Sequence, residues 1–147
     1  MPEYRKFSAY SVIGREGSTL DGEGFVQTLW NTANMSFAEV APLAAQPLVI
    51  WGAMGALDGS LRPWENHISK GKYLAGIEVL PDAQPPAGWV KWVFPAYEAM
   101  VLPMTETAFP EGIALLGELG LTLALAVQER TDPATGESLL IFPIKLL

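Results

Sequence analysis

The chain lacks cysteine entirely and has a single histidine, His67, among its 147 residues. Without cysteine it can form no disulfide, no thiolate nucleophile and no zinc thiolate, and one histidine is too few for a metal-ligand cluster. His67 lies in an expected loop beside no nucleophile motif, so a hydrolytic triad is not predicted. The sequence also has no Walker loop and no dinucleotide fingerprint. We therefore predict no metal site, no bound cofactor and no catalytic residue of these classes.

Long apolar runs and an excess of basic residues are absent as well. The most apolar stretch, 113–127, is interrupted by Gly117, Glu118 and Gly120, so the sequence predicts no membrane span. The first residues show no hydrophobic segment of signal-peptide type, which predicts a cytoplasmic protein. Nine basic and 16 acidic residues give a formal net charge of −7. Nucleic-acid phosphates attract the opposite sign, so we predict no direct nucleic-acid contact.

Apolar periodicity in the first half predicts a strand, a helix and two further strands. Alternation indicates a strand over 4–17. A helical spacing indicates a helix that begins at Phe25 and ends near Asn34. Ser36 and Glu39 have the spacing of a capping box, which predicts a short second helix. The two further strands are expected at 47–56 and 72–80, with a long loop at 57–71 between them.

The second half repeats this order after a stiff connector, 81–88, whose prolines lack amide donors. A strand over 89–104 is expected to break near Pro95. Thr107 is suited to begin a helix that ends at Gly120, a residue that favours C-caps. The last two strands are expected at 121–129 and 139–145.

We predict one α+β domain over 1–147, made of two β-α-β-β repeats at about 1–80 and 81–147. The sheet is antiparallel, and the helices pack on one of its faces. The other face is then either solvated, or concave and used. The repeat is one of pattern alone, because no sequence identity between the halves supports it.

Tryptophan is abundant in this chain. The five residues are Trp30, Trp51, Trp64, Trp89 and Trp92. Any one of them can be explained as a core residue. Cores prefer leucine, isoleucine and valine, however, and a surplus of tryptophan is typical of a ligand pocket or an interface.

Glu78 interrupts the strongly apolar strand at 72–80. Alternation places it on the same face as Leu74, Gly76 and Leu80. Burial of a lone carboxylate is costly unless a partner satisfies it. Glu78 therefore faces either water or a pocket that accepts a cation or a hydrogen-bond donor.

Several short motifs follow one another in a fixed order along the chain. The central motif is Tyr73-x-x-Gly76-Ile77-Glu78-Val79. The others include Trp51-Gly52-Ala53-Met54, Trp64-Glu65-Asn66, Pro95-Ala96-Tyr97 and Ile141-Phe142-Pro143-Ile144. Together they resemble the GyrI-like, or AraC-type effector-binding, superfamily, over about residues 4–145. They look like the branch that includes integron-cassette effector-binding proteins.

This resemblance implies two repeats related by a pseudo-two-fold axis, with a ligand cleft between the halves on the concave face of the sheet. Glu78 matches the central acidic residue that receives cationic, lipophilic ligands. We expect a small aromatic cation there, held by its charge and by ring stacking. The aromatic residues expected to line the site are Trp51, Trp92, Tyr97, Phe142, Trp30 and Trp64. Many relatives carry tyrosine in place of Phe142, so a hydroxyl is missing here.

The implied function is that of a stand-alone multidrug-binding module, acting in sequestration or in ligand sensing for transcription regulation. The chain is too short to carry the helix-turn-helix to which relatives are often fused. It would report the ligand to a protein partner, and a homodimer is compatible with this role. One alternative is an enzyme, because some GyrI-like proteins hydrolyse cyclopropane-bearing genotoxins with a pocket glutamate, here Glu78. A second alternative is an inhibitory protein-interaction module, with a partner such as a topoisomerase.

Overall fold

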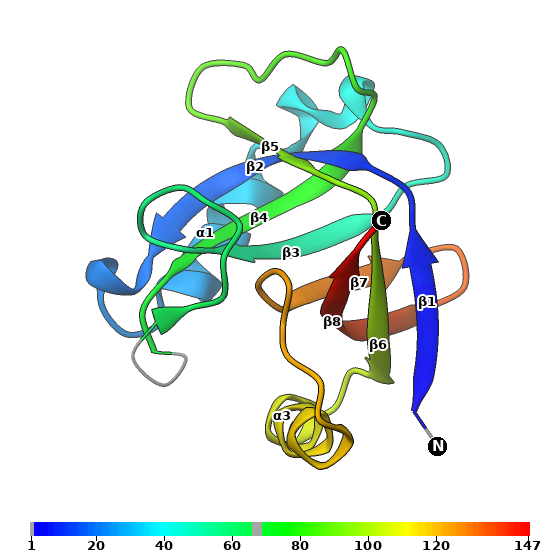
Figure 1. Cartoon of the computed structure of the whole chain (residues 1–147). Coiled ribbons are helices and arrows are strands. Elements are labelled where there is room, and N and C mark those ends of the chain that lie inside the picture. The colour runs from blue at the N-terminus through cyan, green and yellow to red at the C-terminus, as the bar shows by residue number, and fades with distance from the viewer. Residues whose placement is uncertain (1, 66–68) are drawn as a thin grey trace.

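The computed structural model describes residues 2–65 and 69–147, and His67 lies outside them (Figure 1). The strands are β1 (Glu3–Phe7), β2 (Tyr10–Ser18), β3 (Ile50–Gly55), β4 (Lys72–Val79), β5 (Val90–Phe94), β6 (Tyr97–Pro103), β7 (Gln128–Asp132) and β8 (Glu137–Leu146). The α-helices are α1 (Phe25–Met35) and α3 (Ala108–Leu119). Short 3-10 helices lie at Thr19–Asp21, Phe37–Glu39 and Ala41–Leu43.

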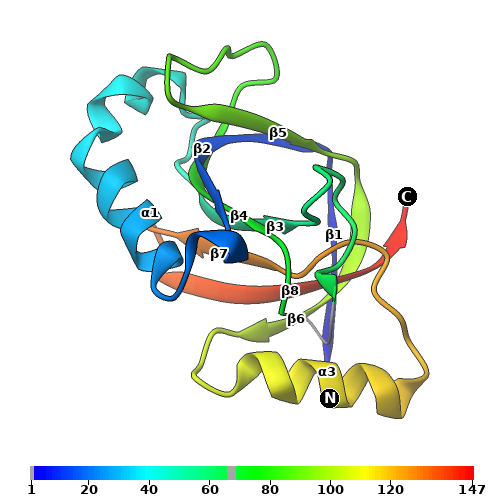
Figure 2. The same ribbon diagram turned by 90° about the vertical axis from the view of Figure 1, so that its left-hand side faces the viewer.

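All eight strands form one antiparallel sheet in the order β1-β6-β8-β7-β3-β4-β2-β5. Figure 2 shows that the sheet curls into a half-barrel, with α1 and α3 on its outer, convex side. The inner, concave side faces the interior of the curl. The predicted α+β class, with an antiparallel sheet and helices on one face, is therefore confirmed.

Two β-α-β-β halves contribute six of the eight strands of the sheet, and they meet where β3 pairs with β7. The first half is β2-α1-β3-β4 and the second is β6-α3-β7-β8, and each pairs its first strand with its last. The remaining strands are exchanged: β1 pairs with β6 of the second half, and β5 pairs with β2 of the first. This exchange ties each half to the segment that precedes the other.

The corners where the exchanged strands enter the halves share a residue pattern. The corners are Phe7-Ser8-Ala9-Tyr10 and Phe94-Pro95-Ala96-Tyr97. Phe7 pairs with Tyr97, and Tyr10 pairs with Phe94. The hydroxyls of the two tyrosines are hydrogen-bonded at 2.6 Å. The halves therefore share residues as well as element order, which goes beyond the repeat of pattern expected from the sequence.

The single strand expected at 4–17 is wrong. It divides at Ser8 and Ala9 into β1 and β2, because these strands pair with opposite halves of the sheet. The break expected near Pro95 is confirmed, between β5 and β6. Proline marks that corner in the sequence, whereas Ser8 and Ala9 carry no comparable signal.

The strand expected at 121–129 is wrong for most of its length. β7 begins only at Gln128, and the residues before it are irregular. Leu121 and Leu123 pack against the buried cluster under α3. The amide of Leu121 also donates to the carbonyl of Leu116 at 2.9 Å, at the end of the helix. This apolar run therefore covers the core beside α3 without forming a strand, although the amide of Ala124 reaches β8, where it donates to the carbonyl of Pro143 at 2.8 Å.

The capping box expected at Ser36 and Glu39 does not form. Ser36 makes no capping hydrogen bond with its side chain. Oε1 of Glu39 instead accepts a hydrogen bond from Nε1 of Trp89 at 2.9 Å. A capping box forms earlier in the chain, between Ser18 and Asp21. The short helix expected after α1 is a 3-10 turn.

Three clusters of buried side chains hold the layers together. The cluster inside the half-barrel includes Trp51, Phe94 and Ile141. A second, which includes Tyr73, lies under α1, and a third, which includes Phe142, lies under α3. Burying one large apolar side chain contributes about 1.5–3 kcal/mol, so the inner face of the sheet is as much a core as the helix-covered face.

Two glycines allow β2 and β4 to approach each other closely. Gly14 pairs with Gly76, and a Cβ atom at Gly76 would clash with the carbonyl oxygen of Ile13 and lie 2.8 Å from Cα of Gly14. Backbone atoms cannot yield as a flexible side chain can. We therefore expect Gly76→Ala to lower the free energy of unfolding by about 1–3 kcal/mol.

Urea denaturation of Gly76→Ala and of a control, Gly117→Ala, measures this effect. Gly117 is exposed in α3 and a Cβ atom there would meet nothing within 4 Å. Alanine at Gly117 is expected to raise the free energy of unfolding by roughly 0.5–1 kcal/mol, because it favours the helix. Equal effects of the two substitutions would contradict the close approach of the strands.

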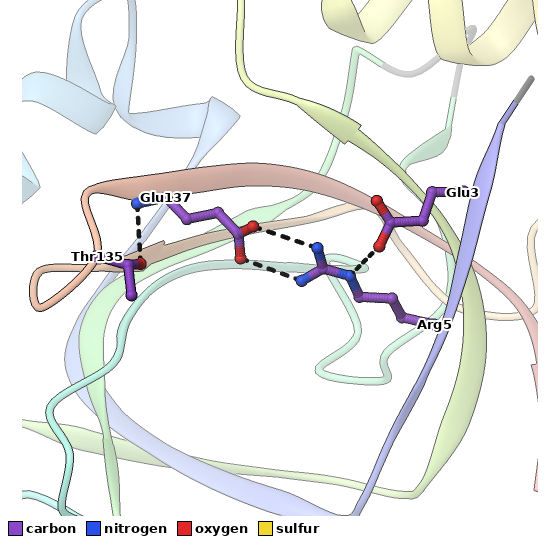
Figure 3. Close-up of polar contacts among 4 residues, drawn as sticks. All are labelled: Glu3, Arg5, Thr135 and Glu137. Carbon is purple, nitrogen blue, oxygen red and sulfur yellow. Dashed lines mark hydrogen bonds and ion pairs between the residues drawn. The ribbon is translucent and has the colours of Figure 1, made fainter.

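Arg5 ties the edge strand β1 to the second half of the sheet (Figure 3). Its guanidinium donates to both carboxylate oxygens of Glu137, at 3.1 and 3.2 Å, and its Nε donates to Glu3. The hydrogen bond from Arg5 lowers the pKa of Glu137. A lowered pKa stabilises the fold above the ordinary pKa of glutamate, and this contribution is lost as pH falls through the lowered value.

Candidate functional site

A groove on the helix side of the sheet, here named the outer groove, is lined by residues from both halves of the chain. Its volume is about 310 Å³. The lining residues are Met54, Trp64, Met104, Thr105, Phe109, Glu129 and Leu140. Among these residues Glu129 alone is charged, so one carboxylate determines the electrostatic character of the groove.

Glu129 lies on β7 directly opposite Gly52 of β3. Gly52 leaves room for it, because a Cβ atom there would clash with both the hydroxyl of Tyr73 and the carboxylate of Glu129. The Tyr73 hydroxyl donates a hydrogen bond to Glu129 and accepts one from Nε1 of Trp30 at 3.1 Å. This chain of bonds connects α1 and β4 of the first half to β7 of the second.

Burial raises the pKa of Glu129 above its ordinary value, and the hydrogen bond from Tyr73 opposes part of the rise. Burial also strongly raises the pKa of Tyr73, so its hydroxyl keeps the proton and remains a donor. Within the described part of the chain Glu129 forms no ion pair. A carboxylate removed from water without a counter-charge is costly, and this cost favours a positively charged ligand in the outer groove.

A second hollow, here named the inner hollow, lies on the concave side at the corner between β1 and β2. Its volume is about 230 Å³. The lining residues are Lys6, Phe7, Ser8, Ala9, Tyr10, Trp51, Glu78 and Arg130. Oε1 of Glu78 accepts a hydrogen bond from Nε1 of Trp51 at 3.0 Å. Two basic side chains share this hollow with Glu78, so its charge is mixed.

Aromatic rings fill the concave side next to the inner hollow. Tyr10 stacks on Trp51 with ring centroids 4.2 Å apart, and on Phe94 at 4.8 Å. Trp51 is 1% exposed and Tyr97 is fully buried. Aromatic pairs contribute about 0.5–1.5 kcal/mol beyond the area they bury, so these rings stabilise the half-barrel.

Solved structures share this fold over nearly the whole chain. The EcmrR C-terminal domain matches with a TM-score of 0.66 and 10% identity, and the match covers 100% of this chain and 98% of that domain. SAV2435 bound to tetraphenylphosphonium matches with a TM-score of 0.60 and 11% identity, over 99% and 94%. The integron cassette protein VCH_CASS2, from the mobile metagenome of Vibrio cholerae, matches with a TM-score of 0.56 and 13% identity. That match covers 99% of this chain and 95% of the cassette protein.

The chain has a GyrI-like fold. It spans 58% of the EcmrR chain in the complex of EcmrR with DNA. No protein-family model and no curated protein matches the sequence. The likeness in fold is therefore established by comparison of structures. The short motifs in the sequence had predicted the same fold.

The GyrI-like fold divides the predicted site residues between the two sides of the sheet. Glu78 and Trp51 lie together at the inner hollow. Tyr97 lies on the same side, and its hydroxyl is bonded to that of Tyr10. Trp92 also packs against the inner cluster, where its Nε1 donates to Glu16 at 2.8 Å.

The other three predicted residues lie on the helix side of the GyrI-like fold. Trp64 lines the outer groove, whereas Trp30 packs against the cluster under α1 and donates from Nε1 to the hydroxyl of Tyr73 at 3.1 Å. Phe142 is fully buried under α3, with its ring centroid 6.4 Å from that of Phe109. Ile141, the residue before Phe142 in β8, lies in the cluster on the concave side. Successive residues of a strand alternate between its faces, so Phe142 points to the side opposite Glu78. The seven predicted residues therefore do not form one site.

Glu129, Tyr73 and Arg130 were not predicted as site residues. Glu129 and Arg130 are neighbours on β7, so they face opposite sides of the sheet and enter the outer groove and the inner hollow, respectively. For Glu129 and Arg130, the sequence signal is the polar run that begins at Gln128 and ends a long apolar stretch. A short polar strand at the junction of two halves places charge on both sides of a sheet.

No group of three or more metal-ligating residues is found in 2–65 or 69–147. Across the same described portion of the chain, no helix has both the length and the apolar character to cross a membrane.

Proposed function

We propose that this chain binds small, lipophilic aromatic cations in the outer groove, with Glu129 as their charge partner. The observation that carries the proposal is a part-buried carboxylate with a raised pKa in a groove whose other lining residues are uncharged. A cation in the groove supplies the opposite charge and lowers that pKa. The role is sequestration of such compounds, or ligand sensing on behalf of a protein partner.

The uncharged lining residues suit an aromatic cation. Trp64 and Phe109 offer ring faces, and a cation over such a ring gains about 0.5–2 kcal/mol, depending on desolvation. Met54 and Met104 are flexible and polarisable, so they adapt to ligands of different shape. Recognition by charge and stacking, with few directional bonds, supports binding of several ligands of one class.

One structure with the same fold supports this choice of ligand class. SAV2435 is bound to tetraphenylphosphonium, a cation with four phenyl rings and no hydrogen-bond donor. Such a ligand is held by charge and by ring contacts alone, and the outer groove offers both. We therefore take tetraphenylphosphonium as the probe for this chain.

The charges of the inner hollow argue against a simple cation beside Glu78. Lys6 and Arg130 line the same hollow and repel a positive ligand. The side-chain carboxylate of Glu78 also has a hydrogen-bond donor already, Nε1 of Trp51. We therefore place the cation of this proposal at Glu129 and not at Glu78.

Two ions of nearly the same shape and opposite charge test the proposal. Calorimetric titration of the full chain with tetraphenylphosphonium and with tetraphenylborate separates charge recognition from hydrophobic contact. A charge about 5 Å from Glu129 at an effective dielectric constant of about 20 is worth about 3 kcal/mol, so the cation is expected to bind at least a hundredfold more tightly. Equal affinities, or tighter binding of the anion, would exclude the charge partner.

A further inference from the structure

A cavity between α1 and the first half of the sheet, here named the α1 cavity, takes no part in the proposed cation groove. Its volume is about 200 Å³. Its deepest lining residues include Ile13, Val40 and Ile77, which are at most 4% exposed. Phe37 is 37% exposed and Leu48 is half-buried, so a small molecule can enter from solvent beside them. Within residues 2–65 and 69–147 the α1 cavity shares no lining residue with the outer groove or the inner hollow.

The lining of the α1 cavity is apolar throughout the described part of the chain. None of these lining residues is charged, and no polar atom is exposed in the cavity. Its two tryptophans have already used their one polar group. Nε1 of Trp30 donates to the hydroxyl of Tyr73 at 3.1 Å, and Nε1 of Trp89 donates to Glu39 at 2.9 Å. A ligand in this cavity therefore forms apolar and ring contacts but no hydrogen bond.

Neighbouring side chains fix the two tryptophan rings. Trp30 meets Tyr73 edge to face, with ring centroids 6.3 Å apart. The guanidinium carbon of Arg15 lies 4.4 Å from the centre of the Trp89 ring. Arg15 and Glu39, which both hold Trp89, form an ion pair at 3.9 Å, so their charges offset each other. The ring wall is thus formed in advance, and little ordering is needed when a ligand binds.

We propose that the α1 cavity binds a small neutral aromatic molecule without hydrogen-bonding groups, such as an alkylbenzene. The volume suits one substituted ring, because an engineered apolar cavity of about 150 Å³ binds benzene. Trp30, Phe37 and Trp89 line the cavity, and ring contacts favour an aromatic ligand over an aliphatic one of equal size. An ammonium group would lose its hydration without gaining a counter-charge, and a hydroxyl would find no acceptor. This ligand class differs from that of the outer groove and does not depend on Glu129.

Three probes of nearly the same shape test the proposal. Ethylbenzene, benzyl alcohol and benzylammonium differ only in a methyl, hydroxyl or ammonium group, and each is titrated into the 15N-labelled full chain and followed by NMR. The indole N–H signal of Trp89 reports on the α1 cavity, and that of Trp64 reports on the outer groove. Ethylbenzene is expected to shift the Trp89 signal and to bind at least tenfold more tightly than benzyl alcohol, whereas benzylammonium leaves that signal unchanged. Equal affinities of ethylbenzene and benzyl alcohol, or a shift of Trp64 alone, would overturn the proposal.

Two variants and one control locate the ligand. Ala33→Leu fills the cavity from α1 with a residue that also favours helices, and it is expected to weaken ethylbenzene binding at least tenfold. Ala114→Leu, at an exposed position of α3, is the matched control and is expected to change nothing. Phe37→Ala removes a ring from the rim, with an expected loss of about fivefold, and it decides the question should Ala33→Leu disrupt the fold. Wild-type affinity for ethylbenzene in either folded variant would also overturn the proposal.

Discussion

Glu129→Gln is expected to weaken binding of tetraphenylphosphonium by about a hundredfold at pH values above the raised pKa of Glu129, where the carboxylate is ionised. The amide has nearly the shape of the carboxylate and can still accept the hydrogen bond from Tyr73, so the groove keeps its form. What is lost is an attraction of about 3 kcal/mol, estimated for unit charges about 5 Å apart at an effective dielectric constant of about 20. Titration calorimetry measures the change.

The control for this substitution is Glu118→Gln, which removes one negative charge from an exposed position in α3. It makes the net charge of the chain one unit less negative, as Glu129→Gln does, but the position is screened by solvent, so a change of less than about twofold is expected. A loss in Glu118→Gln that equals the loss in Glu129→Gln would show that the overall charge, and not the groove, attracts the cation.

The same carboxylate makes binding depend on pH. The pKa of Glu129 is raised in the free protein, and a bound cation lowers it, so binding releases a proton. Affinity for tetraphenylphosphonium therefore rises with pH between these two pKa values, by up to about tenfold per pH unit. The rise is absent in Glu129→Gln. Parallel pH profiles for the wild-type chain and the variant would mean that another group titrates.

Stability has the opposite pH dependence at this residue. A raised pKa in the folded state gives a contribution that is complete below the pKa of the unfolded chain and is lost as pH rises through the raised value. Ionised Glu129 thus weakens the fold above its raised pKa, a cost typical of a functional group held for a ligand.

Gln128→Leu is expected to lower the free energy of unfolding by about 3–5 kcal/mol, because it leaves several buried polar groups without partners. Gln128 is fully buried. Its Oε1 accepts from the amide of Met54 at 3.0 Å, and its Nε2 donates to the carbonyls of Met54 and Ala126 at 2.9 and 3.0 Å. The side chain thereby continues the pairing of β3 with β7, where the two halves meet.

Urea denaturation measures this loss, with Gln84→Leu as the matched control. Gln84 lies in the exposed connector between β4 and β5, and its substitution is expected to change the free energy of unfolding by less than about 0.5 kcal/mol. A loss below 1 kcal/mol in Gln128→Leu would contradict the role of the amide at the junction, on the scale of about 1–3 kcal/mol for each orphaned group.

The fold was readable from the sequence where the signals were local. Helix α3 follows from apolar spacing and from Gly120, which adopts the left-handed conformation of a C-cap. The corner at Pro95 follows from proline. The corner at Ser8 was not readable, because β1 and β2 separate only through pairing with strands about 90 residues apart in sequence.

The site was harder to predict, because burial of a carboxylate depends on distant residues. Glu78 stands out in the sequence as one charge in an apolar strand, yet it shares its hollow with Arg130. Glu129 looks ordinary within a polar run. Its burial arises from Gly52 and Tyr73, which reach it from the other half of the chain. Pairing across the junction, which no local pattern encodes, determines which carboxylate lacks a counter-charge.

The tryptophans of this chain include both core residues and groove-lining residues, and the sequence does not distinguish the two kinds. Trp51 became a fixed core ring, whereas Trp64 lines the outer groove. Both lie in or beside the first half and look alike in the sequence. Their difference comes from the curl of the sheet, which closes the concave side around Trp51 and leaves space beside α3 for Trp64.

The most direct measurement is a crystal structure of the full chain with tetraphenylphosphonium, in which the phosphorus atom marks the position of the charge. Our account predicts phosphorus in the outer groove, within about 6 Å of the Glu129 carboxylate and of an aromatic ring. Phosphorus beside Glu78 on the concave side, or ordered density on the surface with an empty outer groove, would contradict it.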